Sequence, residues 1–162
     1  MQMEQIGTQE AEKEFITTTH QERGLSYKLC NLDHPETVDK VDQCAEFIEQ
    51  AVFKSGITIV TASDLVQKIK SKKSDLWISV DNTGKIVGCM AVGVASYPSD
   101  TGVFVEALAG EFEFQDICKA AEEFYKDRGF AFVEIQGRKG WEKVLSGIGY
   151  QFSNITLIKR LR

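Results

Sequence analysis

The sequence contains few residues that could cross-link a small domain through disulfides or metal, or stiffen its backbone: 162 residues include two prolines, two histidines and four cysteines. The cysteines stand 14, 45 and 29 positions apart, with no C-x-x-C pair, at Cys30, Cys44, Cys89 and Cys118. With only His20 and His34 besides them, this spacing excludes the common zinc motifs. We therefore expect no metal site and four buried, reduced thiols, a pattern that fits the cytoplasm.

Long apolar runs are also missing. The longest, Lys85 to Tyr97, falls short of the roughly 20 residues that a membrane-spanning helix needs. The first ten residues are polar and lack the charged and then apolar order of a secretory signal. The sequence predicts a soluble protein that does not cross a membrane and is not exported through a cleaved signal.

Positive charge is in short supply. The chain has 19 Lys and Arg against 24 Asp and Glu, for a net charge of −5, and its positive residues are scattered. Phosphate binding depends on clustered Lys and Arg, so nucleic acid is disfavoured as the main partner. The length, with 43% hydrophobic residues, instead suits one globular domain whose core needs neither disulfides nor metal.

The first 26 residues differ from the rest. They are polar, include three consecutive threonines from Thr17 to Thr19, and show no sustained apolar period. We therefore predict a polar N-terminal arm over residues 1–26 and a single domain over residues 27–162. An arm of this kind is ordered only when something holds it, which suggests that it contacts a protein partner.

Two helices are predicted in the first half of the domain. From Glu36 to Gly56, apolar residues recur at steps of three and four, which places them on one helical stripe. A second helix follows, with Thr61 or Ser63 as its N-cap and Asp64 in its first turn.

The middle of the chain has the period of strands. A first strand is expected at Leu25–Leu29, before the helices. After them, Leu76–Val80 and Lys85–Ala95 flank the turn residues Asp81 to Gly84, and Val103–Leu108 continues an antiparallel meander.

The last third alternates between helices and strands. Gln115–Arg128 is predicted as a helix, Phe130–Ile135 as a strand, residues from Trp141 to Leu145 as a short helix, and Tyr150–Leu157 as a last strand. A crossover through a helix implies that Val103–Leu108 and Phe130–Ile135 run parallel. The sequence thus predicts one α/β (α+β) domain, with a mixed, mostly antiparallel sheet and helices on both faces.

This order of elements resembles the GNAT family of acyl-CoA N-acyltransferases over about Leu25 to Leu161. The matching features are the helix pair before the meander, the glycine-containing hairpin, and the glycine-aromatic ending. They are carried by Trp77–Asp81 with Lys85–Gly88, by Lys126–Phe130, and by Trp141–Leu145, Gly149–Phe152 and Lys159–Leu161. The resemblance implies the GNAT fold and, in an active member, acetyl-CoA as the donor of an acetyl group.

The same resemblance predicts where a coenzyme would bind. The strand at Val103–Leu108 would splay from its parallel neighbour, and a glycine-rich loop of the form Q/R-x-x-G-x-G/A would hold the pyrophosphate. Here residues 108–116 contain one glycine and no basic residue, and Glu111, Glu113 and Asp116 carry negative charge. We expect no acetyl-CoA binding in the usual mode, since the acids equally suit an ordinary helix N-terminus.

Site residues follow from the resemblance. Glu106 is the first candidate for a general base and Glu134 the second, while Tyr150 or Tyr125 would be the acid for the leaving thiolate. Each of these side chains also has an ordinary structural interpretation on its strand or helix. A coenzyme would contact the backbone or side chains of Ala109, Gly110, Arg138 and Gly140.

The basic turn at Gly137 to Trp141, with Leu145 and Gly149-Tyr150 after it, looks like GNAT-like proteins of tailed bacteriophages. Two hypotheses follow. The first is a degenerate GNAT-like protein without a cofactor, a bacteriophage virion or accessory component in the host cytoplasm or virion, which binds a partner through its arm. The alternative is an active acetyl-CoA-dependent N-acetyltransferase that acts on a small amine or lysine. A small-molecule sensor on the same scaffold is a third possibility.

Overall fold

A computed structural model describes residues 13–20, 24–55, 59–137, 140–153 and 156–161. Six strands form one sheet in the order of the chain, with only the last pair parallel. The strands are β1 (Phe15–His20), β2 (Ser26–Cys30), β3 (Ser74–Val80), β4 (Ile86–Ser96), β5 (Thr101–Gly110) and β6 (Val133–Ile135). The helices are α2 (Thr37–Ser55), α3 (Ala62–Lys70), α4 (Phe114–Asp127) and α5 (Trp141–Ser146). The predicted fold class is confirmed.

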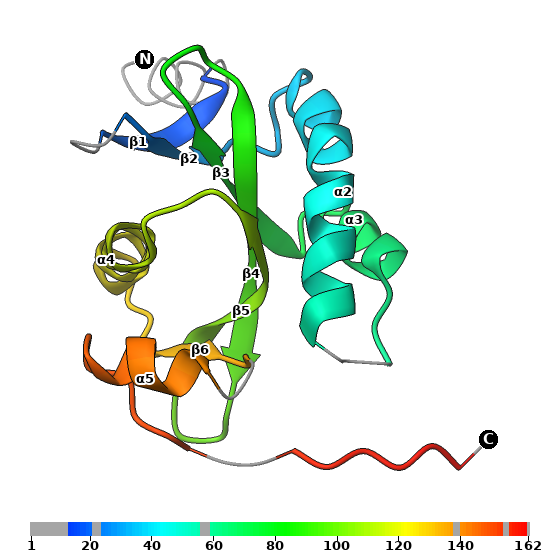
Figure 1. The fold of residues 1–162 in the computed structure, drawn as a ribbon, viewed down its shortest axis with the longest axis vertical. Coiled ribbons are helices and arrows are strands. Elements are labelled where there is room, and N and C mark those ends of the chain that lie inside the picture. The colour runs from blue at the N-terminus through cyan, green and yellow to red at the C-terminus, as the bar shows by residue number, and fades with distance from the viewer. Residues whose placement is uncertain (1–12, 21–23, 56–58, 138–139, 154–155, 162) are drawn as a thin grey trace, which may run out of the picture.

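The sheet has a hydrophobic core on each face. Helices α2 and α3 cover one face and α4 covers the other, as Figure 1 shows. Ile48 and Ile69 are fully buried in the first core, and Trp77 is fully buried in the second, against α4. Each such side chain contributes roughly 1.5–3 kcal/mol by leaving water, so the two cores hold the sheet from both sides.

Helix α3 begins at a capping box. The Thr61 hydroxyl accepts a hydrogen bond from the Asp64 N–H at 3.1 Å, and the Asp64 carboxylate accepts one from the Thr61 N–H at 2.9 Å. These bonds lower the pKa of Asp64. They also decide between the two N-caps that the sequence left open, in favour of Thr61 over Ser63.

The predicted N-terminal arm is wrong for residues 15–20. These residues form β1, which pairs antiparallel with β2 at the edge of the sheet. Alternating Phe15, Thr17 and Thr19 fit a strand, because β-branched and aromatic residues pack well on a pleated surface. Phe15 packs on the first core, and the Lys28 ammonium lies 4.6 Å from the centre of its ring. Residues 1–12 and 21–23 lie outside the described part, and there the arm stays a prediction.

The end of the chain also differs from expectation. Residues 150–153 and 156–161, which cover most of the predicted last strand and the residues after it, form no strand. The expected parallel pair is confirmed, although β6 is only three residues long.

The four cysteines are free and buried, and burial raises the pKa of Cys30 and of Cys118 to about 12. No helix in the described ranges has the length and hydropathy to cross a bilayer.

Candidate active site at the bulge of strand β5

Strand β5 contains one extra residue in its pairing with β4. Val105 lies opposite Val92 and Ala107 lies opposite Ala91, so Glu106 has no partner on β4. This arrangement is a β-bulge, which bends a strand and redirects its side chains. Val105 therefore packs in the core under α4, whereas Ala107, two residues later, packs in the core under α2 and α3.

A cleft opens immediately after the bulge. Strand β6 pairs with β5 only at Val103–Val105, while β5 continues to Gly110 paired with β4 alone. A cavity of about 200 Å³ lies between the diverging strands and the end of α2. Its lining consists of Val105–Gly110, Phe112, Phe114, Gln136, Gly137, Trp141, Ala51, Lys54 and Ser55. The strand divergence expected from the sequence is thus present in the described residues.

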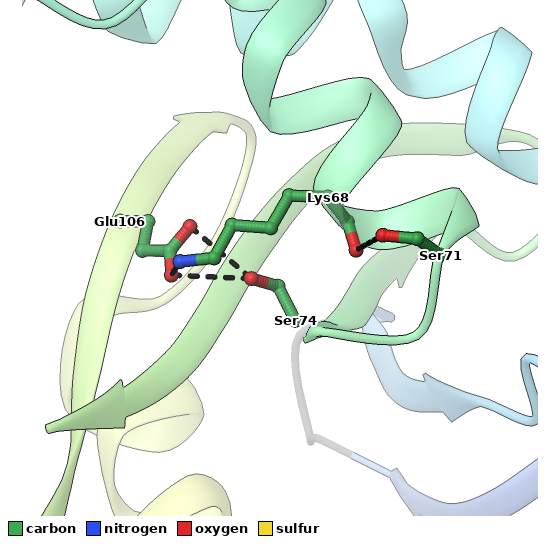
Figure 2. Close-up of polar contacts among 4 residues, drawn as sticks. All are labelled: Lys68, Ser71, Ser74 and Glu106. Carbon is green, nitrogen blue, oxygen red and sulfur yellow. Dashed lines mark hydrogen bonds and ion pairs between the residues drawn. The ribbon is translucent and has the colours of Figure 1, made fainter. Parts of the chain in front are cut away.

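The bulged residue, Glu106, is one of the residues that line this cleft, and its side chain is only 5% exposed. Its Oε1 atom accepts a hydrogen bond from Lys68 Nζ on α3 at 2.5 Å, and Ser74 Oγ on β3 lies 3.1 and 3.2 Å from its two oxygens. Figure 2 shows the three side chains converging from three elements. The Ser71 hydroxyl donates to the backbone carbonyl of Lys68 at 3.1 Å, at the end of α3.

Gly93 on β4 makes room for this carboxylate. A Cβ atom at position 93 would overlap Glu106 Oε1 and lie 3.3 Å from Lys68 Nζ. A glycine inside a strand often marks such a close approach. The position of Glu106 therefore depends on a residue that has no side chain.

The start of α4 forms one end of the cleft. Its N-cap, Glu113, makes no capping hydrogen bond with its side chain, and its N–H donates to the Tyr27 hydroxyl at 2.6 Å. Burial raises the pKa of Tyr27. The N–H of Glu111 donates to the Val87 carbonyl at 2.8 Å. These bonds use two of the backbone donors that a phosphate would need, whereas those of Phe112 and Phe114 make no bond to any described residue.

Aromatic rings form a further part of the cleft wall. The ring centres of Phe112 and Phe114 lie 5.8 Å apart, and those of Phe114 and Trp141 lie 5.5 Å apart with an edge-on geometry. Trp141 lies so close to Gly137 that a Cβ atom there would come within 2.6 Å of the indole. The rings line the cleft but leave it open, and the polar side chains of its lining are those of Glu106, Lys54, Ser55 and Gln136.

Tyr150, a predicted general acid, and Glu134, the second candidate base, do not line the cleft. Tyr150 donates a hydrogen bond to Glu122 on α4 at 2.9 Å and does not line the cleft, and burial with nearby Cys118 raises its pKa. Glu134, the second candidate base, accepts a hydrogen bond from Tyr97 at 2.7 Å on the exposed surface. The structure brings neither of them to Glu106.

The other tyrosine, Tyr125, belongs to a buried network. Its hydroxyl donates to Asp75 at 2.8 Å and accepts from the Trp77 indole N–H at 3.1 Å. Burial, with the Asp75 charge, raises the pKa of Tyr125. Burial also raises the pKa of Asp75, an effect opposed by Tyr125 and by the positive charge of Arg128.

This network predicts a pH dependence of stability. Because the pKa of Asp75 is raised in the folded state, its contribution is fully present below the unfolded value of about 4 and is lost as pH rises through the folded value. We expect the free energy of unfolding of the unmodified chain, relative to Asp75→Asn, to fall as pH rises above about 4. Urea unfolding of both proteins from pH 4 to 7 checks this. A difference that stays constant or grows with pH would contradict it.

The predicted coenzyme contacts divide into two groups. Ala109 and Gly110 line the cleft. Gly140 is the N-cap of α5 and is absent from the lining, and Arg138 lies outside the described residues. Among the described residues, no three His, Cys, Asp or Glu side chains gather closely enough to hold a metal ion.

Several residues of the site could not be identified from the sequence. Lys68 and Ser74 hold Glu106, and Trp141 walls the cleft, yet neither the lysine nor the serine belongs to a recognisable motif. Gly93 was the available signal, because a lone glycine in a strand indicates a bulge or a close approach.

Comparison with known proteins settles the fold. No protein-family model matches the chain, and neither does any curated protein. Solved structures do match: a predicted acetyltransferase from Clostridium acetobutylicum, solved with acetyl-CoA, superposes with a TM-score of 0.65. It is 14% identical, over 85% of this chain and 96% of that one. This chain has the GNAT fold.

Two further GNAT-fold structures have acceptors in their names. An aminoglycoside acetyltransferase from an uncultured soil metagenomic sample matches with a TM-score of 0.62 and 15% identity, over 87% of this chain and 99% of that one. The glucosamine-6-phosphate N-acetyltransferase of Arabidopsis thaliana matches with a TM-score of 0.59 and 11% identity, over 85% and 99%. The GNAT resemblance in the sequence is thus confirmed at the level of fold.

Proposed function

We propose that this protein is an N-acyltransferase that moves an acyl group from an acyl-CoA thioester, acetyl-CoA in the simplest case, to a primary amine. The observation that carries the proposal is the bulge at Glu106, which lies where β5 and β6 part and includes this acidic residue in the lining of the cleft. The amine acceptors in the names of two neighbours of the same fold support a small amine as the acceptor. A lysine side chain has the same reacting group.

The residues of the cleft fit the pantetheine part of such a donor. From Glu106 to Gly110, the edge of β5 that faces the cleft has no partner strand, so its backbone groups can bond to the amides of a pantetheine arm. Ala107, Ala109 and Gly110 are small, which leaves room for that arm. The expectation of no cofactor therefore loses its support in this part of the site.

The start of α4, where the phosphates of the coenzyme would lie, is less suited to its ligand than the pantetheine part of the cleft. Glu111, Glu113 and Asp116 surround the start of α4, and Lys54 is the one cation among the described lining residues. Each like-charge contact near the surface costs on the order of 1 kcal/mol. The N–H groups of Phe112 and Phe114 remain as donors, so we expect binding that is weaker than the fit of the pantetheine arm alone would give.

The chain's own residues supply the remaining chemistry. An acyl thioester, when bound, provides an electrophilic carbonyl carbon. Glu106 would take a proton from the ammonium form of the acceptor, directly or through water, and so free the nitrogen lone pair. Lys68 and Ser74 hold the carboxylate in one orientation.

Calorimetry with acetyl-CoA tests the proposal, together with an assay of thiol release against a panel of amines. We expect saturable binding in the micromolar range and amine-dependent release of coenzyme A. A Phe114→Lys variant, which replaces an aromatic lining residue by a cation at the start of α4, should bind acetyl-CoA more tightly, by roughly tenfold for about 1.4 kcal/mol. No heat of binding and no release in either protein would remove the proposal.

A second candidate is a binding protein that has lost its cofactor. The acidic start of α4 favours it, together with the Tyr27 hydroxyl that already occupies the N–H of Glu113. In its concrete form the protein would be a bacteriophage virion or accessory component in the virion or host cytoplasm, with the first residues of the chain against a protein partner. Absence of acetyl-CoA binding in the experiment above would favour this candidate.

A further inference from the structure

A second cavity lies between the start of β3 and the last turn of α4. Its volume is about 300 Å³, at the lower end of the range found for small-molecule sites, and it shares no lining residue with the cleft beside Glu106. The first turn of α4 borders that cleft, whereas the last turn borders the second cavity, and a helix of this length spans about 20 Å. The two cavities can therefore hold two different molecules.

Much of the lining of the second cavity is apolar. Val103 is buried there, and the rings of Phe124 and Phe130 are half-buried. Two other apolar residues of the lining face water, since Ile16 is 50% exposed and Val94 is 60% exposed. Ile16 is also the extra residue of a bulge in the pairing of β1 with β2, and bulges often redirect a side chain at a functional site. Exposed apolar side chains around a concave apolar wall indicate a ligand with an apolar body.

The lining also carries positive charge. Lys72, Lys73 and Arg128 belong to it and are exposed, in a chain whose net charge is −5. Lys72 forms an ion pair with Asp33. Arg128 Cζ lies 3.4 Å from the centre of the Phe124 ring, and its Nη1 atom donates to the Phe124 carbonyl at 3.3 Å. A guanidinium has five donors, so Arg128 is held at the edge of the apolar wall and can still bind an anion, with Lys73 as a second cation.

The single acid among the described lining residues, Asp75, opposes an anion only weakly. Its Oδ2 atom accepts a hydrogen bond from the Tyr125 hydroxyl at 2.8 Å, and burial raises its pKa, which disfavours its charged form. The negative end of the α4 dipole is also partly satisfied. The Tyr125 carbonyl there accepts hydrogen bonds from the N–H groups of Arg128 and Phe130, both at 3.1 Å. Positive charge therefore dominates at the second cavity.

We propose that the second cavity binds an amphipathic carboxylate, a small molecule with an unbranched apolar body and one anionic head group. The body lies against the valine and phenylalanine side chains of the lining, and the head group meets Arg128 and Lys73. A guanidinium can hold a carboxylate through two parallel hydrogen bonds, which selects this head group over a neutral or a cationic one. Medium-chain fatty carboxylates have this chemistry.

Calorimetry on the full-length chain tests the proposal without any acyl donor, so its failure is separate from failure of the proposed acyl transfer. The probes are decanoate, decanol and decyltrimethylammonium below their micelle concentrations, which have one chain length and three head groups. We expect one site with micromolar affinity for decanoate and at least about tenfold weaker binding of decanol, because a hydrogen-bonded charge is lost. The quaternary ammonium cannot act as an acyl acceptor and should not bind.

Variants locate the site. Arg128→Met should weaken decanoate binding at least about tenfold, and Arg128→Lys should restore most of the loss. Val94→Glu places a negative charge at an exposed position of the lining and should weaken binding in the same direction. Lys126→Met is the matched control, because it removes a cation from the same turn of α4 outside the lining. Its affinity should stay within about twofold of the unmodified chain, as expected for a distant exposed charge.

Four results would overturn the proposal. The first is no binding of decanoate to the unmodified chain, and the second is binding of decyltrimethylammonium as tight as that of decanoate. The third is an equal loss of affinity in Arg128→Met and Lys126→Met. The fourth is a loss in Lys54→Met without one in Arg128→Met, because Lys54 lines the cleft beside Glu106 and the carboxylate would then bind there. Circular dichroism should show every variant folded.

Discussion

Replacement of Glu106 by Gln should lower kcat for acetyl transfer at least about 100-fold, with little change in the KM for acetyl-CoA. The amide has nearly the shape of the carboxylate, and its oxygen can still accept from Lys68 and Ser74. It cannot take a proton from the acceptor, and a positioned general base typically contributes 100-fold or more. Steady-state assays with the best amine of the panel measure the effect.

Glu134→Gln is the matched control. It makes the same chemical change on the neighbouring strand, where the carboxylate accepts from Tyr97 outside the cleft. We expect its kcat to stay within about twofold of the unmodified protein, and circular dichroism should show both variants folded. Equal loss in the two variants, or loss only in Glu134→Gln, would remove Glu106 as the base.

Gly110→Ala should destabilise the protein by about 3 kcal/mol or more. Gly110 has a φ of +98°, which side chains disfavour, and an added Cβ would overlap the Val87 carbonyl oxygen and the Gly88 Cα atom. The positive φ alone costs roughly 1–2 kcal/mol, and overlap with backbone adds a similar amount because neither strand can easily yield. Urea unfolding measures the difference.

Gly140→Ala is the matched control, because it makes the same substitution where neither the backbone conformation nor a neighbouring atom disfavours a Cβ. Gly140 has a φ of −66°, and no atom lies within 4 Å of an added Cβ. Its free energy of unfolding should rise slightly, by no more than about 1 kcal/mol, because alanine restricts the unfolded chain. If the two substitutions had equal effects, the close approach at Gly110 would not be the cause.

The fold was largely accessible from the sequence because local signals agreed with it. Apolar residues at helical spacing predicted α2 and α4, and the turn residues between β3 and β4 predicted their hairpin. The failures lie at the two ends. Strand β1 is rich in threonine and was interpreted as a polar arm, since its pairing with β2 depends on contacts that no local period records.

The site was predictable only in part. Glu106, Ala109 and Gly110 were expected at the cleft from their places on and after the strand, and all three are among the residues that line it; their roles stay predictions. The bulge that turns Glu106 toward Lys68 is a feature of register between β4 and β5, and register depends on two segments at once. Tyr150 was proposed from residue type alone, and its actual partner, Glu122, comes from a distant helix.

The extra residue in β5 makes two properties of the protein, the Glu106 carboxylate and the gap beside β6, depend on a single position in the sequence. Deleting Glu106 would remove the carboxylate and also restore the regular alternation of the strand, so the gap beside β6 would lose its cause. A lineage could therefore lose the proposed catalytic activity and its pocket in one mutational event, whereas substitution at the same position would remove only the proposed base and leave the cleft for a new ligand.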